Sequence, residues 1–569
     1  MKSAQTLRGD LRAIDRKSYP AYKSLAGSYG FGKYILHIEH VQGDPFAAPS
    51  RVSVEVDQKT AGFPAALRNT RENRTALADY LLRRFRRQSD RFCFQAKGSG
   101  KSGVISVTRC GQEVLERTGC EVSEGRILVR FEVGFPANGR TINASELEKI
   151  LFDFLPVCVE ESLLFASTPA GEAAGVIALA EDQQFIRREL ERLELAAFVA
   201  DGSILPRESG ASDRPMGDAV PFRAPETMAV TLQLPHRGPL RGLGVRRGIT
   251  LIAGGGYHGK STLLKALERG VYNHIAGDGR EYVITDASAL KIRAEDGRKI
   301  TGTDISLFIN RLPNGRDTTR FSTLDASGST SQAANIVEGL EAGARVLLID
   351  EDTSATNFMV RDELMQRVIA RDKEPITPFL ERAADLYEKA GVSTVLVVGS
   401  CGAYFHIAHQ ILQMDAYRPV DITASTRALL RDAPAPVLRA PGFQLPAGKR
   451  PLRLAGAAQS RKSYRGGGYV QERLKIRRTG KRAFSLGGEE LDLRWVEQLA
   501  DEEQTTALAW LLRWARENAG RLDGTVDGAA RTLAGILETE GLAGVCSGGV
   551  PSGLAMPRIQ EIFACLNRC

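Results

Sequence analysis

The sequence has no run of about eighteen consecutive apolar residues, which is the length that a membrane-spanning helix needs. Its eight cysteines form no Cys-x-x-Cys pair and have no histidine partners at zinc spacing, so neither a disulfide scaffold nor a zinc domain is expected. We expect reduced thiols, as in a cytoplasmic protein. Met1–Gln5 do not begin the apolar stretch of a secretory signal. No fixed-period repeat and no long heptad array is present, which excludes a long-armed coiled coil.

What is present is an ordinary globular composition, with 43% hydrophobic and 25% charged residues over 569 positions. At roughly 100–200 residues per domain, this length predicts more than one domain. The formal net charge of +8 is modest for such a chain. It matters only where the basic residues are clustered, because clustered cations attract phosphate backbones.

Composition divides the chain into three blocks. We expect a mixed α+β N-terminal domain over 1–205, an α/β core over 226–432 and a basic C-terminal domain over 445–569. The stretch Asp201–Pro225 is rich in glycine, proline and charge, and Ala433–Pro436 alternates alanine with proline. Both stretches indicate linkers.

Apolar periodicity predicts the elements of each block. In the first block it predicts a helix over Thr75–Gln88 and strands over Phe92–Gln95, Gly103–Thr108 and Ile127–Val133. In the core, short apolar runs alternate with helical patterns, which is typical of a largely parallel sheet covered on both faces. Its strands are expected at Ile249–Ala253, Tyr282–Thr285, Val346–Ile349 and Val392–Val398. The last block ends in helical patterns such as Leu491–Arg516.

A glycine-rich loop follows the first core strand and opens a helix at Lys260. It fits the phosphate-binding pattern G-x-x-x-x-G-K-[ST] in full, through Gly254, Gly255, Gly256, Tyr257, His258, Gly259, Lys260 and Ser261, with Thr262 next. Glycines let backbone N–H groups turn toward phosphate oxygens, and the helix N-terminus adds a positive dipole end. We therefore expect ATP here, with Lys260 reaching the β- and γ-phosphates and Ser261 ligating Mg²⁺. His258 is expected to pack or bond locally.

A second stretch, Gly98–Gly103, fits this pattern only in part. Gln95 stands where the first glycine is required, and no helix follows. We expect a flexible hairpin tip between two strands. Either a solvated loop or an anion contact through Lys97 and Lys101 suits it.

The apolar strand Val346–Ile349 runs into two acids, Asp350 and Glu351. A buried strand can deliver Asp350 to a Mg²⁺ ion, while Glu351 can polarise an attacking water. We expect Glu351 and Lys260 to be catalytic, with Asp350 and Ser261 as metal ligands.

Two stretches around this strand resemble the head domain of the ABC class of ATPases. Asp350–Asn357 resembles Asp-Glu-Pro-Thr-Ser-Ala-Leu-Asp, the Walker B motif and D-loop, and Ala326–Gln332 resembles the signature Leu-Ser-Gly-Gly-Gln at a helix start. The resemblance implies that Ser327, Gly328 and Ser329 contact the γ-phosphate of a nucleotide held by a second chain. Because one chain carries one full set of motifs, a homodimer with two ATP molecules between its subunits is expected.

Several further stretches are similar to a narrow group, the predicted ATPases of the ABC class whose relatives include a kinetoplastid mitochondrial RNA-binding ATPase. These stretches are Gln42–Ala47, Gly254–Leu264, Tyr272–His274, Gly277–Glu281, Ala326–Asn335, Asp350–Met359 and Glu374–Phe379. The resemblance implies an ABC-like P-loop core with two flanking domains, and nucleic acid as a partner. An ABC transporter would need separate membrane subunits, and none is expected here.

The chain departs from ordinary ABC heads at two places. After the strand Val392–Val398, where a switch histidine is expected, the sequence has Gly399-Ser400-Cys401. Turnover is then slow, or another side chain substitutes. The glutamine of the Q-loop is not evident either. Asp304 is our candidate for that position on the Mg²⁺ side, and Asn310 is a second one.

Basic residues cluster in the C-terminal block between Lys449 and Arg482, with Tyr464 and Tyr469 among them. Clustered cations with aromatic rings suit a polyphosphate backbone and stacked bases, although a charge run can also be only a solvated face. Phosphate contacts do not distinguish RNA from DNA. Nucleic-acid contacts are expected at Arg461, Lys462, Arg465, Arg473, Lys475, Arg477, Arg478 and Lys481, and on a second basic element at Arg83, Arg84, Arg86 and Arg87.

The leading hypothesis is an ATP hydrolase. In this hypothesis, ATP binding closes a homodimer around the nucleotide and changes its affinity for nucleic acid. A nucleotide-gated binding module with negligible turnover is the alternative that the missing histidine favours. A P-loop kinase of a small molecule explains only the glycine-rich loop. Membrane binding is not expected, because no apolar face accompanies the basic residues.

Overall fold

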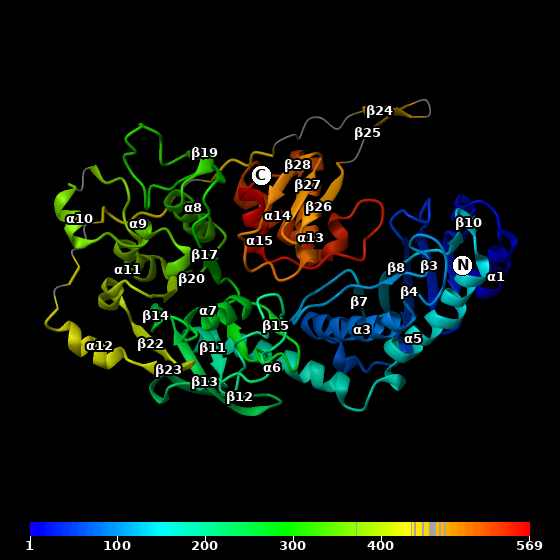
Figure 1. The fold of residues 1–569 in the computed structure, drawn as a ribbon, viewed down its shortest axis with the longest axis horizontal. Coiled ribbons are helices and arrows are strands. Elements are labelled where there is room, and N and C mark those ends of the chain that lie inside the picture. Colours follow the sequence, from blue (N-terminus) through cyan, green and yellow to red (C-terminus); the bar gives the residue numbers. More distant parts are fainter. Residues whose placement is uncertain are drawn as a thin grey trace. The chain divides into compact units, whose positions relative to one another are not determined.

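The computed structural model describes residues 1–370, 373–433, 435–436, 440–446, 449–454, 462–465, 468–471 and 474–569. Two compact units make up the chain (Figure 1). The first consists of Met1–Glu181 with Glu540–Met556, and the second of Asp182–Thr539 with Pro557–Cys569. Every helix within the described residues is too short or too polar to cross a bilayer.

The first unit is built on a mostly antiparallel sheet in the order β1-β2-β3-β4-β8-β5, with β7 also paired to β8. Its β1–β2 contact is parallel. The strands are β1 Lys2–Ser3, β2 Gly27–Gly30, β3 Ile35–His40, β4 Ser50–Asp57, β5 Ile105–Ser106, β7 Cys120–Val122 and β8 Arg126–Val133. The helices are α1 Ala4–Ala13, α2 Gln58–Ala61, α3 Arg71–Phe92, α4 Ala144–Glu148, α5 Leu155–Leu163 and α6 Glu172–Arg192, which continues into the second unit.

Helix α3 is the long helix that the periodicity predicts over Thr75–Gln88. Thr70 caps it by accepting a hydrogen bond from the N–H of Asn73, and the buried side chains include Leu77, Leu81 and Phe85. The apolar face therefore packs on β7 and α5, as an amphipathic helix requires.

The strand predictions of the first block meet different outcomes. The one at Ile127–Val133 is confirmed, because it lies within β8. The one at Phe92–Gln95 is wrong: α3 continues to Phe92, and the chain then turns through Phe94, whose φ is +63°. Of Gly103–Thr108, only Ile105–Ser106 is strand. Aromatic residues favour strands in general, but here the packed helix end decides.

The Gly98–Gly103 stretch is a closely packed turn, so the prediction of a flexible hairpin tip is wrong. The N–H of Ser99 donates to the carbonyl oxygen of Ala137 at 2.7 Å, and that of Lys101 donates to the carbonyl oxygen of Pro45 at 2.9 Å. A Cβ on Gly103 would lie 2.0 Å from the carbonyl oxygen of Ala96, so glycine is required there.

A C-terminal segment completes the first unit. The N–H of Thr118 donates to the carbonyl oxygen of Leu554 at 3.0 Å, and the N–H of Leu554 donates to the hydroxyl of Thr118 at 3.1 Å. The N–H of Met556 donates to the carbonyl oxygen of Glu116 at 2.9 Å. Residues 540–556 therefore pair with backbone that lies more than four hundred positions earlier in the sequence.

The second unit is built around a six-stranded sheet in the order β17-β20-β21-β14-β22-β23, which is parallel except between β22 and β23. The strands are β14 Ile249–Ala253, β17 Leu290–Ile292, β20 Val346–Asp350, β21 Ser393–Val397, β22 Gln410–Asp415 and β23 Arg418–Asp421. The helices in this part are α7 Lys260–Arg269, α8 Gly328–Glu341, α9 Thr356–Met359, α10 Glu363–Val368, α11 Phe379–Ala390 and α12 Thr423–Leu430, and the hairpin β18 Arg298–Thr303 with β19 Phe321–Ala326 precedes α8. The expected α/β architecture with a largely parallel sheet is confirmed.

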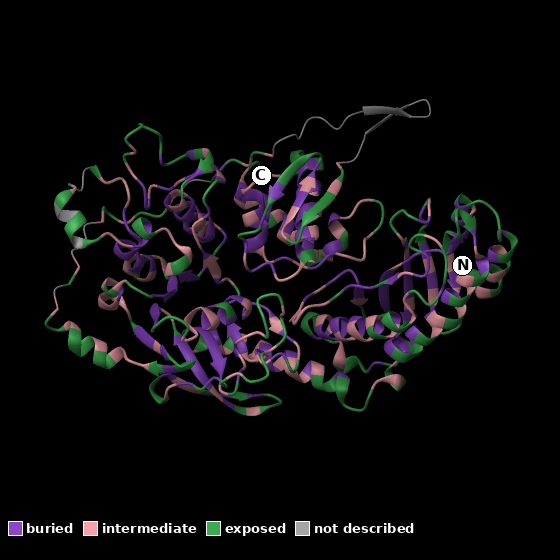
Figure 2. Ribbon diagram, viewed as in Figure 1, coloured by how far each residue is buried: buried purple, intermediate pink, exposed green. Residues whose placement is uncertain are grey.

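The central strands β14, β20 and β21 are buried along their whole length, as Figure 2 shows in purple. Unbroken apolar runs are typical of parallel strands that helices cover on both faces. One predicted strand belongs elsewhere: Tyr282–Thr285 corresponds to β16, in a separate antiparallel sheet in the order β12-β13-β11-β16. Its members are β11 Leu195–Ala200, β12 Ala229–Leu234, β13 Gly238–Arg246 and β16 Val283–Thr285.

The C-terminal part of the second unit holds an antiparallel sheet and three helices. These elements are β26 Ile476–Gly480, β27 Ala483–Leu486, β28 Glu489–Asp492, α13 Glu502–Glu517, α14 Val526–Thr539 and α15 Ile559–Asn567. The predicted helical pattern Leu491–Arg516 is correct only in its second half, because Leu491 lies in β28 and α13 begins after the cap Asp501.

A buried charged cluster joins the helix α8 to the C-terminal residues. Arg450 donates to both carboxylate oxygens of Glu341, at 2.5–2.9 Å, and to the side-chain oxygen of Asn567 at 2.6 Å. Arg568 donates to Glu295 at 2.6 Å, and Arg298 pairs with Glu338. Because buried charges are stable only when they are paired, this cluster fixes the C-terminal residues to α8.

We predict that Arg450→Met lowers the free energy of unfolding by about 3 kcal/mol, because it leaves the partly buried Glu341 carboxylate without its partner. Burial already raises the pKa of Glu341, and Arg450 opposes that rise. The measurement is urea unfolding followed by tryptophan fluorescence, which reports on this part of the chain because the three tryptophans are Trp495, Trp510 and Trp514.

The matched control is Arg494→Met. Arg494 forms an exposed ion pair with Asp492, and such pairs contribute about 0–1 kcal/mol. Equal shifts of the unfolding midpoint for the two variants would show that the buried cluster does not stabilise this unit.

Candidate nucleotide site

The glycine-rich loop lies between the end of β14 and the start of α7. A Cβ on Gly254 would lie 2.5 Å from the carbonyl oxygen of Met414, so the first glycine of the pattern is required by close packing. Lys260 donates to the carbonyl oxygens of Gly254 and Gly255, at 2.7 Å each, which holds its ammonium group inside the turn of the loop. Ser261 and Thr262 follow in the first turn of α7 and are partly exposed. The N-terminus of α7 therefore presents its N–H groups and a lysine to one small region, as a phosphate site requires.

The acid pair lies at the same edge of the sheet as this loop. In the parallel register Val397 of β21 is paired with Ile252 of β14 on one side and with Asp350 of β20 on the other. Neighbouring strands lie about 4.8 Å apart, so Asp350 and the start of the loop are separated by roughly 10 Å. The Asp350 side chain is buried, and its Oδ1 accepts a hydrogen bond from the N–H of Asp352 at 3.3 Å.

Glu351 is held by the segment where a switch histidine is expected. The N–H groups of Gly399 and Ser400 donate to its Oε2 at 2.6 and 3.1 Å, and the hydroxyl of Ser400 donates to its Oε1. Sequence reasoning noted the missing imidazole but missed Ser400. Its position directly after β21 was the signal that could have identified it.

These contacts determine the charge of Glu351. Burial alone would raise its pKa, but hydrogen bonds from the Ser400 hydroxyl and from the N–H groups of Gly399, Ser400 and Cys401 outweigh that effect. The pKa of Glu351 therefore lies below its ordinary value, and the side chain is a carboxylate at neutral pH. A carboxylate in this place can accept hydrogen bonds from a water molecule.

The predicted signature segment forms the tip of α8. Ser327 is the cap residue of the helix and is exposed, while Ser329 is buried. The Ser327 hydroxyl lies 3.3 Å from the hydroxyl of Ser329 and 3.0 Å from that of Thr330. A Cβ on Gly328 would lie 3.5 Å from Cβ of Ala355, so the tip touches the segment that resembles the D-loop.

Gln332 connects this helix with the acid pair. Its Nε2 donates to the hydroxyl of Ser354 at 3.0 Å, and its Oε1 accepts from the N–H of Ala355 at 2.9 Å. The Ser354 hydroxyl in turn donates to the carbonyl oxygen of Asp350 at 2.9 Å. Helix α8 is therefore connected with the backbone at Asp350 through the side chains of Gln332 and Ser354.

His258 connects the glycine-rich loop with the β22–β23 turn. Its Nδ1 accepts from the N–H of Ala416 at 2.9 Å, and its carbonyl oxygen accepts from the N–H of Tyr417 at 3.2 Å. The imidazole therefore bonds locally, on the side of the loop away from the acid pair's strand.

The two Q-loop candidates make local hydrogen bonds. The carboxylate of Asp304 accepts from the N–H of Ser306 at 3.0 Å, and the amide of Asn310 donates to the carbonyl oxygen of Ser306. A role of Asp304 as a metal ligand stays a prediction.

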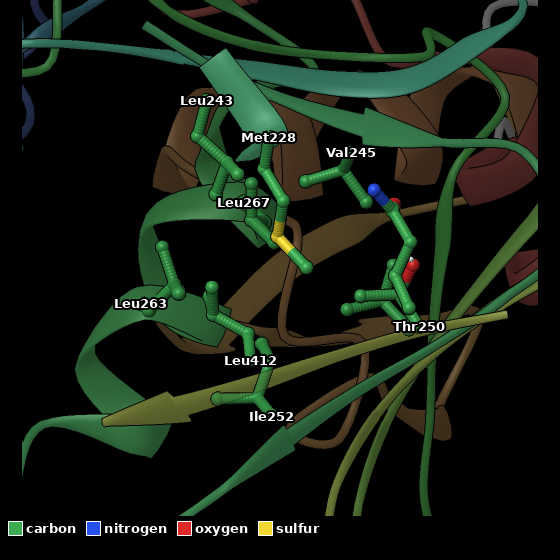
Figure 3. A pocket seen from close by; sticks show the side chains of 10 residues that line it. Met228, Leu243, Val245, Thr250, Ile252, Leu263, Leu267 and Leu412 are labelled. Carbon is green, nitrogen blue, oxygen red and sulfur yellow. Dashed lines mark hydrogen bonds between the residues drawn. The ribbon is translucent and has the colours of Figure 1, made fainter. Parts of the chain in front are cut away.

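An apolar cavity lies between α7, the antiparallel sheet and the parallel sheet, and Figure 3 shows the side chains that line it. Met228, Leu243 and Val245 come from the antiparallel sheet and the turn before it, and Leu263 and Leu267 come from α7. The lining has no charged group, so this cavity is a packing gap in the core and not a phosphate site.

The basic element of the N-terminal unit is largely engaged in its own packing. Arg83 pairs with Asp79 at 2.6 Å, and Arg84 donates to the Tyr80 hydroxyl at 3.0 Å and to a backbone carbonyl. Arg86 pairs with Asp90, and Arg87 is exposed. The contacts with Asp79, Tyr80 and Asp90 each join residues four positions apart, a spacing that helical periodicity could have indicated.

The basic C-terminal segment is described in part. Lys475, Arg477 and Lys481 are exposed on and around β26, while Arg478 pairs with Glu502 at 2.8 Å. Lys462 and Arg465 lie in β24, Lys462–Arg465, which pairs with β25, Gly468–Gln471. Arg461 and Arg473 lie outside the described residues.

Three models of protein families match the chain. The P-loop domain of the ABC ATPases matches residues 170–445, the N-terminal domain of ATPases of the ABC class matches 4–166, and the C-terminal domain of MRB1590 matches 475–569. An uncharacterized protein of Methanocaldococcus jannaschii, MJ1628, is 32% identical over 228 residues, which are 38% of this chain. The chain spans about half the length of this curated relative.

The matched regions follow one another along the sequence, and the site residues from Gly254 to Ser400 all lie within the P-loop match. The chain therefore belongs to the ABC class of ATPases, with the P-loop domain of that class between its N-terminal domain and a C-terminal domain related to that of MRB1590.

Proposed function

We propose that the protein hydrolyses ATP between two copies of itself and couples this cycle to the binding of nucleic acid. The observation that supports it best is the chain of contacts from Gln332 through Ser354 to Asp350, since it joins the predicted signature tip to the acid pair. A P-loop that only bound a nucleotide would not need this connection. In an ATPase of two facing subunits, this connection would couple the nucleotide that contacts the signature tip of one subunit to the acid pair of that same subunit.

The residues present fit ATP and Mg²⁺. The loop from Gly254 to Gly259, Lys260 and the N-terminus of α7 form an anion cradle. Within the described residues no three His, Cys, Asp or Glu side chains form a metal site alone, so Mg²⁺ would be held by Ser261 and Asp350 together with phosphate oxygens. Bound there, Mg²⁺ would neutralise charge on the β- and γ-phosphates.

The catalytic roles follow from the side chains. Glu351 is an ionised carboxylate that can orient a water molecule and polarise it for attack on the γ-phosphate. Lys260 supplies positive charge for the transferred group. Ser400, which donates to Glu351 through its hydroxyl and its N–H, would take the place of the absent switch histidine by positioning this carboxylate.

The exposed signature tip supports the proposal of a homodimer. Ser327 caps α8 without a hydrogen bond from its hydroxyl to the helix backbone, so the hydroxyl and the N–H groups behind it can meet a phosphate from outside the chain. Two copies related by a twofold axis would each complete the site of the other.

Nucleic acid is the proposed partner because exposed cations follow one another on and around β26, at Lys475, Arg477 and Lys481. The sheet that carries them belongs to the same compact unit as α8. ATP binding or hydrolysis could thus affect the basic surface without involving the other unit.

A second candidate is a nucleotide-gated nucleic-acid-binding module with negligible turnover. It is supported by Gly399-Ser400-Cys401, which offers no imidazole to the γ-phosphate. A steady-state rate of phosphate release equal to that of a Lys260→Ala variant would favour it over the hydrolase. A small-molecule kinase explains neither Gln332 nor the signature tip.

We predict that Glu351→Gln lowers the rate of ATP hydrolysis by about a hundredfold or more, because the amide can bind water but cannot accept its proton. The variant should accumulate as an ATP-bound dimer. Phosphate release and light scattering with and without ATP measure the two effects. Asp352→Asn, at the exposed neighbouring acid, is the matched control and should keep wild-type turnover. Wild-type turnover in Glu351→Gln would remove Glu351 from the mechanism.

A mixing experiment tests whether the site is shared between two chains. Lys260→Ala and Ser327→Arg should each abolish hydrolysis alone, since each variant dimer has the same defect in both sites. In a mixed dimer, the intact loop of one chain faces the intact tip of the other, so about a quarter of wild-type activity should return in an equimolar mixture. No recovery, with subunit exchange shown by differently tagged chains, would contradict a site built from two copies.

The basic surface can be tested by charge removal. Replacing Lys475, Arg477 and Lys481 by alanine should weaken RNA or DNA binding and lower the slope of log affinity against log salt by about one per lost phosphate contact. A triple variant of the exposed residues Arg16, Lys17 and Lys23 removes the same charge and is the control. Equal weakening by both triples would show that net charge, not this surface, governs binding.

A further inference from the structure

Trp495 is an exposed aromatic side chain in the C-terminal part of the second unit, where it follows the strand β28. It is 42% exposed, whereas the other two tryptophans, Trp510 and Trp514, are half-buried. An indole ring has a large apolar surface, and its exposure to water is unfavourable unless another group contacts it. The open part of this ring is therefore a candidate contact for a partner.

A guanidinium group supports the Trp495 ring from the side of the protein. The central carbon of the Arg293 guanidinium lies 3.8 Å from the centroid of the ring, so it covers one face of the indole. Arg293 is itself held in place, because it donates a hydrogen bond to the Glu497 carboxylate at 3.0 Å and its side chain is only 16% exposed. A cation on one face orients the ring and leaves its opposite face for a further contact.

Exposed cations lie at the same end of the C-terminal sheet as this ring. Asp492, the last residue of β28, is paired with Ala483, the first residue of β27. Lys481, in the turn before β27, and Arg494, directly before Trp495, therefore lie at one end of the sheet, and both are exposed. Arg494 also pairs with Asp492. The ring thus lies beside part of the basic surface and not on an apolar patch.

We propose that Trp495 is the base-stacking contact for single-stranded nucleic acid on the C-terminal domain. A nucleic-acid strand carries phosphates for the cations and flat base faces for the indole. In a duplex each base is already stacked between its neighbours, so an unpaired base is the one that can present its face to the ring. The inference rests on the proposed binding of nucleic acid and specifies single strands as its substrate class.

The residue behind the ring comes from the segment that borders the candidate nucleotide site. Arg293 directly follows β17, which is paired with β20. The N–H of the next residue, Ala294, donates to the carbonyl oxygen of Thr353 at 3.0 Å, in the turn after the acid pair. The proposed stacking contact and this turn therefore belong to one connected set of residues within the second unit.

The test compares oligonucleotides that differ in strandedness. Binding of a labelled single strand of about fifteen nucleotides, and of a duplex of the same length, is measured on the full chain by fluorescence anisotropy, for RNA and for DNA. Trp495→Ala should weaken single-strand binding by about tenfold, since a stacked base is lost. It should leave duplex binding and the salt dependence unchanged, because no phosphate contact is removed.

Two further variants serve as controls for this comparison. Trp495→Phe should retain most of the affinity for the single strand, because it keeps an aromatic face. Leu429→Ala removes an exposed apolar side chain from α12 of the same unit and should bind both oligonucleotides as the wild type does.

A fluorescence measurement keeps the proposal testable if Trp495→Ala fails to fold. In a variant that combines Trp510→Phe and Trp514→Phe, Trp495 is the only tryptophan. Its emission should be quenched by the single strand and not by the duplex. Equal quenching by both oligonucleotides would contradict stacking on an unpaired base.

The remaining outcomes overturn specific claims. Equal weakening of single-strand and duplex binding by Trp495→Ala would mean that the ring only supports the basic surface, and unchanged single-strand binding would remove Trp495 from it. Loss of dimerisation in sedimentation, with single-strand binding unchanged, would assign the ring to a second copy of the chain. If the wild type binds neither single strands nor duplexes, the proposed binding of nucleic acid is itself wrong, whatever the result at Trp495.

Discussion

The pairing of β21 with both β14 and β20 is the constraint on which the candidate site depends. Val397 is paired with Ile252 on one side and with Asp350 on the other, so the phosphate-binding loop and the acid pair end at one edge of the sheet. A slip of one residue in either ladder would move Asp350 to the other face of the sheet. The segment after β21 then supplies Ser400 and Gly399 to Glu351, so a single strand orders three parts of the site.

The sequence predicted the parts of this site that depend on neighbours in the chain. The glycine pattern, the apolar strand before Asp350 and the helix start at Ser327 are local features, and each lies in the element expected for it. Ser400 could not be found in this way. It contacts Glu351, 49 positions away in the sequence, and such a contact depends on the order of strands in the sheet.

The fold shows the same division. The parallel core was predictable because buried strands need unbroken apolar runs. The strand expected at Phe92–Gln95 is a helix end and a turn, since the packing of α3 outweighs the strand preference of aromatic residues. The charges of Arg83 and Arg84 were visible in the sequence, and the spacing of four residues to Asp79 and Tyr80 could have indicated these contacts on a helix. The contact of Arg84 with the carbonyl oxygen of Ser167 could not be foreseen, because it depends on the fold.

The path of the chain between the two units has a consequence for any attempt to divide the protein. The backbone leaves the first unit within α6, returns after Thr539 to place Leu554 against Thr118, and leaves again at Pro557. Three covalent crossings therefore tie the units together. A fragment that ends at Glu181 lacks one edge of its own fold, and a truncation before Glu540 damages both halves at once. If a protease cuts only one of these three connections, the two units stay covalently linked until the other two connections are also cut.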